Sequence, residues 1–303
     1  MDKTFETRPA NFIVVTGLGL EISSPAADFL TGKHPVISER DLFHDPDPRE
    51  FLVRPKTLKF MSKQDRLALV AAGKALRGSG IDPESLKTSC GLFMAVGYIP
   101  FRREEAEMIS AHAQEDGQFS MDRFTTDAFD RVNPLLAFSC LPNMPGHHVS
   151  ANFDLQGEYF MTYPGMPEFF LALQEAVGHL QAGDMDFALV GGVADQNNFL
   201  VQNHFRKYRP GHPFMDADVS AFLVLERVAQ AEKRGKAPLL YLRSLEVCAN
   251  LENSVLCKEN PTLEMGPAEL PARLCLLGRD HQGYFNHAHH AHDHIFKSTW
   301  EVV

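Results

Sequence analysis

Residues 157–192, GEYFMTYPGMPEFFLALQEAVGHLQAGDMDFALVGG, decide the fold of this chain. The β-prone letters YFMT are followed by the breaker pair Pro164 and Gly165, and Pro167 then supplies the fixed φ that suits the first position of a helix. Apolar residues recur at helical spacing until Gly183, after which the apolar run FALV follows. The stretch therefore predicts a strand, a sharp turn, an amphipathic helix and a second strand.

The predicted turn is the place where many enzymes mount a nucleophile, because it presents one side chain at the positive end of a helix. Here the turn consists of Tyr163, Pro164, Gly165, Met166 and Pro167. A methionine thioether cannot be deprotonated and forms no acyl intermediate. Taken alone, the stretch is equally compatible with an ordinary buried βαβ segment.

Composition sets broad limits on the function. The chain has 303 residues with 44% apolar content, which suits one large or two ordinary domains. Its 29 basic and 39 acidic residues give a net charge of −10, which disfavours nucleic acid as a partner. No run reaches the length of a membrane span, and the first residues lack the apolar core of a signal peptide, so we expect a cytoplasmic protein. The five cysteines show no CxxC pairing, which predicts free thiols.

Short sequence motifs predict the first strand and the first long helix. Residues 12–15 predict a buried strand that runs into a glycine turn, TGLG, at 16–19. The other glycines of a dinucleotide fingerprint and the lysine of a P-loop are missing, so no nucleotide cofactor is expected, and no other cofactor is indicated. The tetrapeptide SKQD at 62–65 resembles a capping box that opens a strong helix to about Ser79.

The remaining pattern alternates strands and helices. The predicted elements are a strand at 92–96, a charged helix at 102–114, a surface excursion to 133, short helices at 134–141 and 144–153, a polar connector after 192, a strand at 221–225, a helix at 227–234 and a strand at 239–247. This alternation favours an α/β layered domain with a mixed sheet over residues 1–250. Residues 251–303 show no sustained period and are expected to form an irregular C-terminal extension with a histidine-rich tail.

Five segments, in order and at matching spacing, resemble the N-terminal half of β-ketoacyl synthases, the thiolase-fold condensing enzymes of fatty-acid and polyketide synthesis. They are VVTGLG (14–19), KFMSKQDRLALVAAGKALRGSGI (59–81), LPNMPGHHVSANFDLQG (141–157), GHLQAGDMDFALVGG (178–192) and PFMDADVSAFLVLERVAQAEKRGKAPL (213–239). The resemblance implies an α/β fold with a thiolase-like N-terminal lobe, a mixed sheet layered between helices, and a second lobe that is truncated or absent. It is greatest to the short sequences called chain-length factors of aryl-polyene-type clusters.

The departures from the family pattern bear on activity. The catalytic cysteine of the family falls on Met166, counted from either Gly157 or Gly183. Gln156 stands where the family often has arginine, and the tight G-E-G before its A-x-x-x-L-E strand is replaced by the letters DVS. Both histidine motifs of the family's second half are absent, and about 55 residues after Val247 are too few for another five-stranded half-domain.

The resemblance therefore implies a catalytically silent synthase-like protein, a pseudoenzyme that forms a heterodimer with an active ketosynthase and helps to set the length of a polyketide, polyene or fatty-acid chain. Its expected pocket and partner residues are Leu136, Asn143, Tyr163 and Met166. By the same resemblance, Lys56, Lys59 and Lys63 would dock an acidic acyl carrier protein, although a solvated helix start explains these lysines equally well. His147 and His148 would lie at the dimer interface or pack inside the chain.

Two alternatives belong to other classes. The chain could be an acyltransferase-type enzyme with relocated chemistry, either at Cys140 or at a metal held by the histidine-rich tail. A buried structural thiol is the favoured interpretation of both Cys140 and Cys90. The chain could instead be a stand-alone module that binds an acyl chain or an acyl carrier protein. The densest cluster of metal-ligand side chains is in the tail, where the spacing matches no zinc motif and no metal site is predicted; its weak candidates are His287, His289, His290, His292 and His294.

Overall fold

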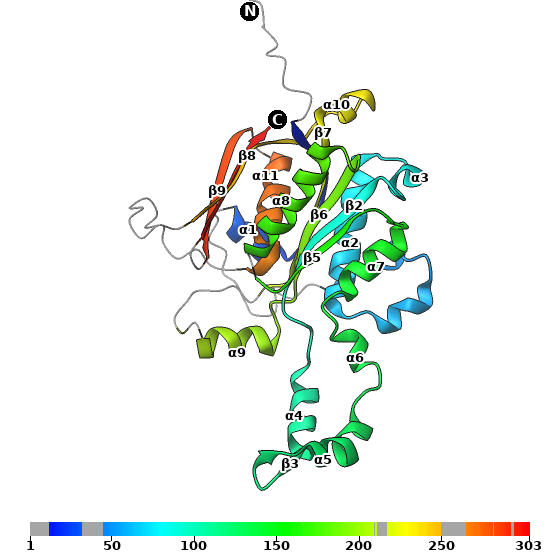
Figure 1. The fold of residues 1–303 in the computed structure, drawn as a ribbon, viewed down its shortest axis with the longest axis vertical. Coiled ribbons are helices and arrows are strands. Elements are labelled where there is room, and N and C mark those ends of the chain that lie inside the picture. The colour runs from blue at the N-terminus through cyan, green and yellow to red at the C-terminus, as the bar shows by residue number, and fades with distance from the viewer. Residues whose placement is uncertain are drawn as a thin grey trace, which may run out of the picture.

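The computed structural model describes residues 12–31, 45–165, 167–208, 210, 217–249, 265–280, 282–291 and 294–303. These residues build an eight-stranded mixed sheet in the order β5-β2-β6-β7-β1-β8-β10-β9 (Figure 1). Its strands are β1 (Ile13–Ile22), β2 (Cys90–Val96), β5 (Tyr159–Thr162), β6 (Phe187–Ala194), β7 (Val219–Arg227), β8 (Leu240–Ala249), β9 (Gly283–Ala291) and β10 (His294–Val302). Strands β5, β2 and β6 are parallel, and the other neighbours pair antiparallel. The α/β fold with a large mixed sheet is confirmed.

Helices cover both faces of this sheet. Helices α2 (Lys63–Ser79) and α7 (Met144–Phe153) lie on one face, where their apolar residues pack with those of β2 and β6. Helices α8 (Pro167–Ala182) and α11 (Glu269–Asp280) lie on the opposite face (Figure 1). The predicted bounds of α2 and α8 are confirmed, because the SKQD capping box and Pro167 start them and glycines at positive φ end them.

The expected glycine turn at 16–19 is wrong. Strand β1 continues through both glycines with a register shift between Val15 and Gly17. Helix α2 crosses so close to β1 that a Cβ at Gly19 would lie 1.8 Å from the Ala71 carbonyl oxygen. Because Gly17 and Gly19 have no side chain, helix α2 can pack directly against the backbone of β1.

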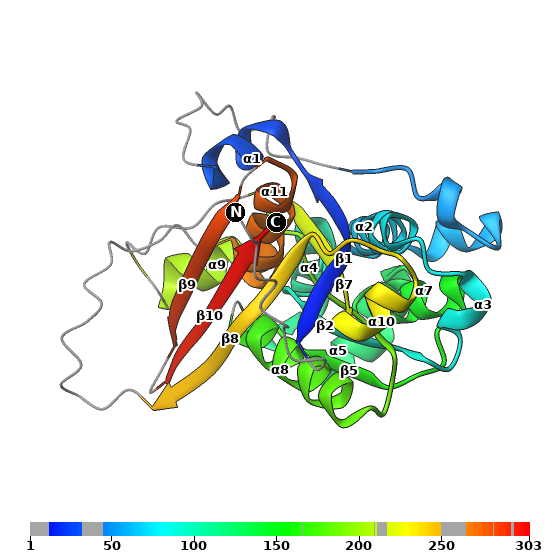
Figure 2. The ribbon, with the colours of Figure 1, turned by 90° about the horizontal axis from the view of Figure 1, so that it is seen from above.

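The expected irregular structure beyond 251 is also wrong for residues 265–280, 282–291 and 294–303. Strand β10 pairs with β8 on one side and with β9 on the other, so these residues extend the main sheet. The three strands curve around α11 and α8 (Figure 2), and Trp300 is fully buried among the residues of that core. Residues 251–264 lie outside the described part of the chain.

Residues 97–142 form an arm that extends away from the sheet (Figure 1). It contains α4 (Arg103–His112), β3 (Gln114–Glu115), β4 (Gln118–Phe119), α5 (Met121–Arg123), a π-turn (Phe124–Ala128), a 3-10 turn (Phe129–Arg131) and α6 (Leu136–Ser139). This arm matches the predicted surface excursion. Its two ends return to the body beside the start of α2.

Smaller helices complete the structure. They are α1 (Ser24–Leu30), α3 (Pro83–Leu86), α9 (Phe199–Tyr208), α10 (Val228–Lys233) and 3-10 turns at Arg49–Phe51, Pro55–Phe60 and Gly266–Ala268. Helix α9 occupies the segment that was expected to be a polar connector, and it buries Val201 and Phe205. In the described part of the chain, every helix is too short or too polar to cross a bilayer.

Candidate functional site

The candidate site lies where the parallel strands end. Strands β5, β2 and β6 run in the same direction, so their carboxyl ends meet at one edge of the sheet. In open α/β sheets ligands bind at this edge. The chain continues from these ends into Tyr163, Tyr98 and Asp195, respectively.

Strand β5 is followed by a bend at Pro164 and Gly165, and α8 begins at Pro167, as predicted. The Thr162 hydroxyl donates to the Glu168 carbonyl oxygen over 3.0 Å, which ties the end of the strand to the first turn of the helix. The Tyr163 ring lies edge-on to Tyr98 at 6.1 Å, and the Tyr98 hydroxyl is 2.9 Å from Nδ1 of His204 on α9. The rings of Tyr98, Tyr163 and His204 therefore pack together beside this turn. Met166, the residue at the expected nucleophile position, lies outside the described residues.

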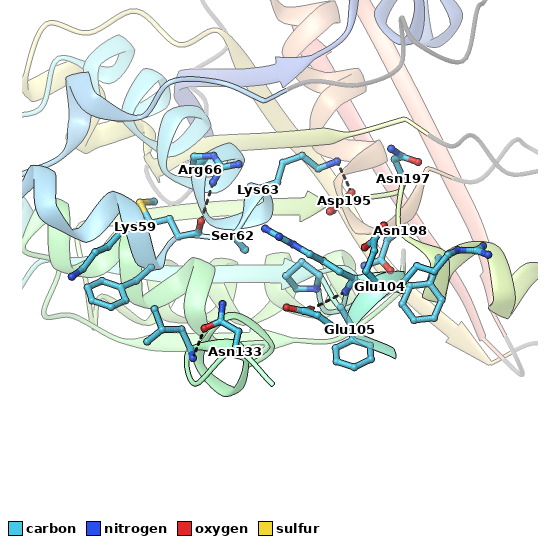
Figure 3. Close-up of a pocket in the computed structure, with 18 of the residues that line it drawn as sticks. Lys59, Ser62, Lys63, Arg66, Glu104, Glu105, Asn133, Asp195, Asn197 and Asn198 are labelled. Carbon is cyan, nitrogen blue, oxygen red and sulfur yellow. Dashed lines mark hydrogen bonds and ion pairs between the residues drawn. The ribbon is translucent and has the colours of Figure 1, made fainter. Parts of the chain in front are cut away.

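Beside this edge is a cavity of about 490 Å³ (Figure 3). Residues of the first turns of α2, α4 and α9 line it, so the positive ends of three helices lie around one space. The cationic side chains on its wall are Lys59, Lys63, Arg66, Arg102 and Arg103, and the acidic ones are Glu104, Glu105 and Asp195.

An ion cluster closes the inner end of the cavity. The Lys63 ammonium lies 2.8 Å from Asp195 and 2.9 Å from Asp218 (Figure 3 shows the contact with Asp195). Asp195 follows β6 and Asp218 precedes β7, where Ala194 pairs with Val219. Two carboxylates therefore lie side by side at the end of a ladder, and a cation between them relieves the repulsion of like charges.

The charge of this cluster depends on pH. Burial raises the pKa of Asp195 to about 7, against the opposing attraction of Lys63, and the neighbouring Asp218 adds to the rise. Burial acts to lower the pKa of Lys63, but the charges of Asp195 and Asp218 outweigh it and raise that pKa above its usual value. At pH 7 the Asp195 carboxyl is therefore protonated in about half of the molecules, beside the Lys63 ammonium.

The three lysines expected to form a docking set differ in exposure. Lys56 and Lys59 are exposed on the 3-10 turn before α2, and Lys59 lies over the Phe60 ring at 4.6 Å. Lys63 points into the protein, with 21% of its side chain exposed. We therefore remove Lys63 from the expected docking surface. Its acidic partners are far away in sequence, so the residues around it gave no signal of this role.

The expected partner residues lie around the base of the arm. Leu136 starts α6 and is 8% exposed, whereas Phe138 in the same helix is 55% exposed. Asn143 is the exposed residue that precedes α7, and its side chain makes no capping bond. Tyr163 is partly exposed and accepts a hydrogen bond from the Ile99 amide over 3.4 Å. Tyr163 and the arm are thus joined by a direct contact.

The described residues of the histidine-rich tail lie in two paired strands, β9 and β10. His287 and His289 lie in β9, His294 begins β10, and His292 lies outside the described residues. The His287 ring stacks on Phe170 of α8 at 5.9 Å, and burial lowers its pKa to about 3. In the described part of the chain, no group of three or more His, Cys, Asp or Glu side chains is arranged to hold a metal ion.

The cysteines also have defined positions. Cys90 and Cys275 are buried, and burial raises the pKa of each thiol to about 12. The interpretation of Cys90 as a structural thiol is confirmed. Cys140 follows α6 and is half-buried. A thiol held in its protonated form is a poor nucleophile, so Cys90 and Cys275 are unsuited to acyl transfer.

Comparison with known proteins agrees with this geometry. The profile of the β-ketoacyl synthase N-terminal domain matches residues 30–214, more than half of the chain. The chain belongs to this family. Similar curated proteins are the polyketide synthase GfsA of Streptomyces halstedii, 24% identical over 253 residues, and the mycoketide-CoA synthase of Mycobacterium tuberculosis, 27% identical over 208 residues. These matches cover 78% and 63% of this chain but only 3% and 4% of the two relatives.

Solved β-ketoacyl synthases share the fold. A type II polyketide ketosynthase in complex with its acyl carrier protein superposes with a TM-score of 0.73 at 15% identity. The ishigamide ketosynthase/chain length factor superposes with a TM-score of 0.65 at 14% identity. Each comparison covers 96% of this chain and 99% of the other chain. The thiolase-like ketosynthase fold is therefore shown.

Proposed function

We propose that this chain is a catalytically silent β-ketoacyl synthase-like subunit that pairs with an active ketosynthase, as a chain-length factor does, in polyketide, polyene or fatty-acid synthesis. The observation that carries the proposal is the turn between β5 and α8, where residues 162–167 read TYPGMP. None of these residues offers the thiolate or the activated hydroxyl that a condensing enzyme needs to hold an acyl chain. The ketosynthase partner would supply that group.

The arm and the sheet edge support an interaction with another chain. Strand β5 is an edge strand, and an edge of this kind invites pairing with another chain. Large apolar side chains are exposed on the arm and beside β5; they are Phe119, Met121, Phe129, Phe138, Leu141, Tyr159 and Tyr163. Exposed apolar surface of this extent marks an interaction site. A homodimer would join two sites without a nucleophile, so the partner we propose is an active synthase.

Phe138 replaces Leu136 as the residue that we expect to meet the partner's growing chain. Leu136 is covered by its own chain, whereas the Phe138 side chain is free to enter a neighbouring subunit. An aromatic ring at that point would limit the space for the product. Phe138→Ala is therefore expected to lengthen the product of the assembly.

A carrier protein is the second partner that we propose. Lys56 and Lys59 are exposed on the 3-10 turn before α2, where Lys59 lines the cavity, and Arg102 and Arg103 lie at the start of the arm. Exposed cations steer an acidic partner by long-range attraction. We expect Lys59→Glu to weaken carrier binding and Lys63→Met to have little direct effect on it, because Lys63 is turned inward.

Co-expression with full-length ketosynthases, followed by co-purification and size-exclusion chromatography, tests the proposal. We expect a hetero-oligomer that Phe138→Asp disrupts. Val53→Asp is the matched control, because Val53 is 68% exposed but lies outside the arm and β5. A monomer that binds no synthase, or equal effects of the two variants, would contradict the proposed partner.

A further inference from the structure

The tip of the arm, residues 113–132, presents a row of large apolar side chains to solvent. Phe119 and Met121 are each 65% exposed, and Phe129 is 62% exposed. The Phe124 ring lies between those of Phe119 and Phe129, at centroid distances of 6.0 and 6.3 Å. The elements of the tip pack on one another and on α4, and the arm carries them away from the sheet (Figure 1). Exposed apolar side chains gathered in this way mark an interaction site.

Local structure holds these rings in place. In the β3–β4 hairpin, Asp116 and Gly117 have positive φ angles of 51° and 77°, which suit the two-residue turn that the pair Asp-Gly favours. This turn places Phe119 on β4. The Phe129 amide donates to the Phe124 carbonyl oxygen, which is the bond between residues five apart that defines a π-turn and keeps both rings on one side. Rings that are fixed before binding lose little conformational entropy when a partner covers them.

The arm tip is also acidic. Residues 113–132 contain five acidic and two basic side chains, a net charge of −3. The acidic residues are Glu115, Asp116, Asp122, Asp127 and Asp130. One of the two basic residues, Arg123, is bound to Asp127 at 2.9 Å. The arm tip therefore has an apolar centre with a charged rim, as protein–protein interfaces commonly do, and its rim is negative.

This charge distinguishes between the two proposed partners. At the base of the arm, Lys59, Arg102 and Arg103 line the cavity, and cationic side chains outnumber acidic ones among its described lining residues. An acidic carrier protein would be attracted to the base of the arm and repelled by its tip. A ketosynthase surface that carries cations around an apolar groove would match both the rings and the carboxylates.

We propose that the arm tip docks on the ketosynthase subunit, in an apolar groove rimmed by lysine or arginine side chains. This inference rests on the proposed function, which names the ketosynthase as partner, and it adds the chemistry of a second contact. The first contact is formed by β5 and the base of the arm, around Tyr163 and Phe138. In such an interface the rim charges speed association, whereas the buried rings set the lifetime of the complex.

Photo-crosslinking tests the place and the chemistry of this contact together. p-Benzoylphenylalanine would replace Phe129, and the variant would be co-expressed with a ketosynthase that co-purifies with the wild-type chain. Irradiation is expected to join the two subunits, and peptide mapping should find the link in a ketosynthase segment where lysine or arginine flanks apolar residues. The same replacement at Val53, which is exposed outside the arm and β5, is the control. An equal yield at both positions, a link to an acidic segment, to the carrier protein or to a second copy, or no link at all, would overturn the proposal.

Charge reversal provides a second measurement. Asp122→Lys with Asp130→Lys reverses two exposed carboxylates of the arm tip, and Asp82→Lys with Glu232→Lys makes the same change outside the arm. On immobilised ketosynthase at low salt, the tip variant should associate about tenfold more slowly than the control, with a smaller difference at high salt. Phe129→Ser should dissociate about tenfold faster than the wild type. Unchanged melting temperatures would show that the variants fold, and equal association rates of the two double variants would overturn the proposal.

These outcomes differ from a failure of the proposed function. If no ketosynthase binds the wild-type chain, the proposed function fails and this inference fails with it. If a complex forms and Phe138→Asp disrupts it, but the arm tip gives no crosslink and its charge reversal has no effect, the proposed function stands and only the docking of the arm tip is overturned.

Discussion

The ion cluster at the inner end of the cavity permits a quantitative prediction. In Lys63→Met the two carboxylates lose their cation, while Asp218 stays fully buried and Asp195 nearly so. Removing one partner of a buried ion pair costs about 3–5 kcal/mol. Lys63 retains 21% exposure, so we place the loss in the free energy of unfolding at about 3 kcal/mol at pH 8, a factor of roughly 100 in the folding equilibrium.

The loss should depend on pH in a definite direction. The pKa of Asp195 is raised to about 7 in the folded protein, above its usual value of 3.8, so the folded state favours the protonated carboxyl. This contribution to stability is complete at low pH and is lost as pH rises towards 7. When Lys63 is absent, Asp195 takes up a proton more readily. The destabilisation by Lys63→Met should therefore be smaller at pH 6 than at pH 8.

Urea unfolding followed by Trp300 fluorescence at pH 6 and pH 8 measures both effects. Lys59→Met is the matched control, because Lys59 is exposed and lies four residues earlier; it should change stability by less than about 0.5 kcal/mol. The triple variant with Lys63→Met, Asp195→Asn and Asp218→Asn should recover most of the loss, because no buried charge remains. A Lys63→Met variant as stable as Lys59→Met at pH 8, or one with the same loss at both pH values, would refute the reasoning.

Three further predictions concern other parts of the chain. Folding raises the pKa of Asp65 to about 6 and lowers the pKa of His148 to about 4. As pH rises from 4 to 6, the contribution of Asp65 to the free energy of unfolding therefore decreases and that of His148 increases. Relative to the wild type, urea midpoints measured over this range should therefore slope upward for Asp65→Asn and downward for His148→Gln; slopes of the same sign would contradict these pKa values. Met166→Cys alone should give no malonyl-dependent chain extension, because the family's two histidine motifs are also absent; any extension by the isolated variant would show otherwise. Strand β10 has ladder partners on both sides, so its amides should exchange slowly, and fast exchange of Ser298 or Trp300 would contradict the structure.

Local signals in the sequence predicted the elements that depend on local chemistry. The SKQD capping box and the glycine after Ser79 fix α2, and Pro167 and Gly183 fix α8, because caps and glycine conformations act within one turn of a helix. The resemblance to β-ketoacyl synthases supplied the fold and the position of the nucleophile turn. Neither the helix bounds nor the family resemblance required knowledge of contacts between residues far apart in the sequence.

The errors have physical reasons. Gly17 and Gly19 suggested a turn, but their role is to let α2 approach β1, which only the packed structure shows. The histidines of β9 suggested a solvated tail, yet a neutral imidazole such as that of His287 packs on Phe170 as an aromatic ring does. Lys63 suggested a docking lysine, because its partners are separated from it by more than a hundred residues. Long-range pairing carries no signal in a single sequence.

Intact-mass spectrometry of the co-purified assembly, after exposure to an acyl carrier thioester, tests the central claim most directly. The proposed function predicts that the mass of an acyl group appears on the ketosynthase subunit and that this chain keeps its unmodified mass. Tryptic mapping would then locate the adduct on the synthase nucleophile. A stable acyl adduct on this chain, at Cys140 or at any other residue, would contradict the claim that it is catalytically silent.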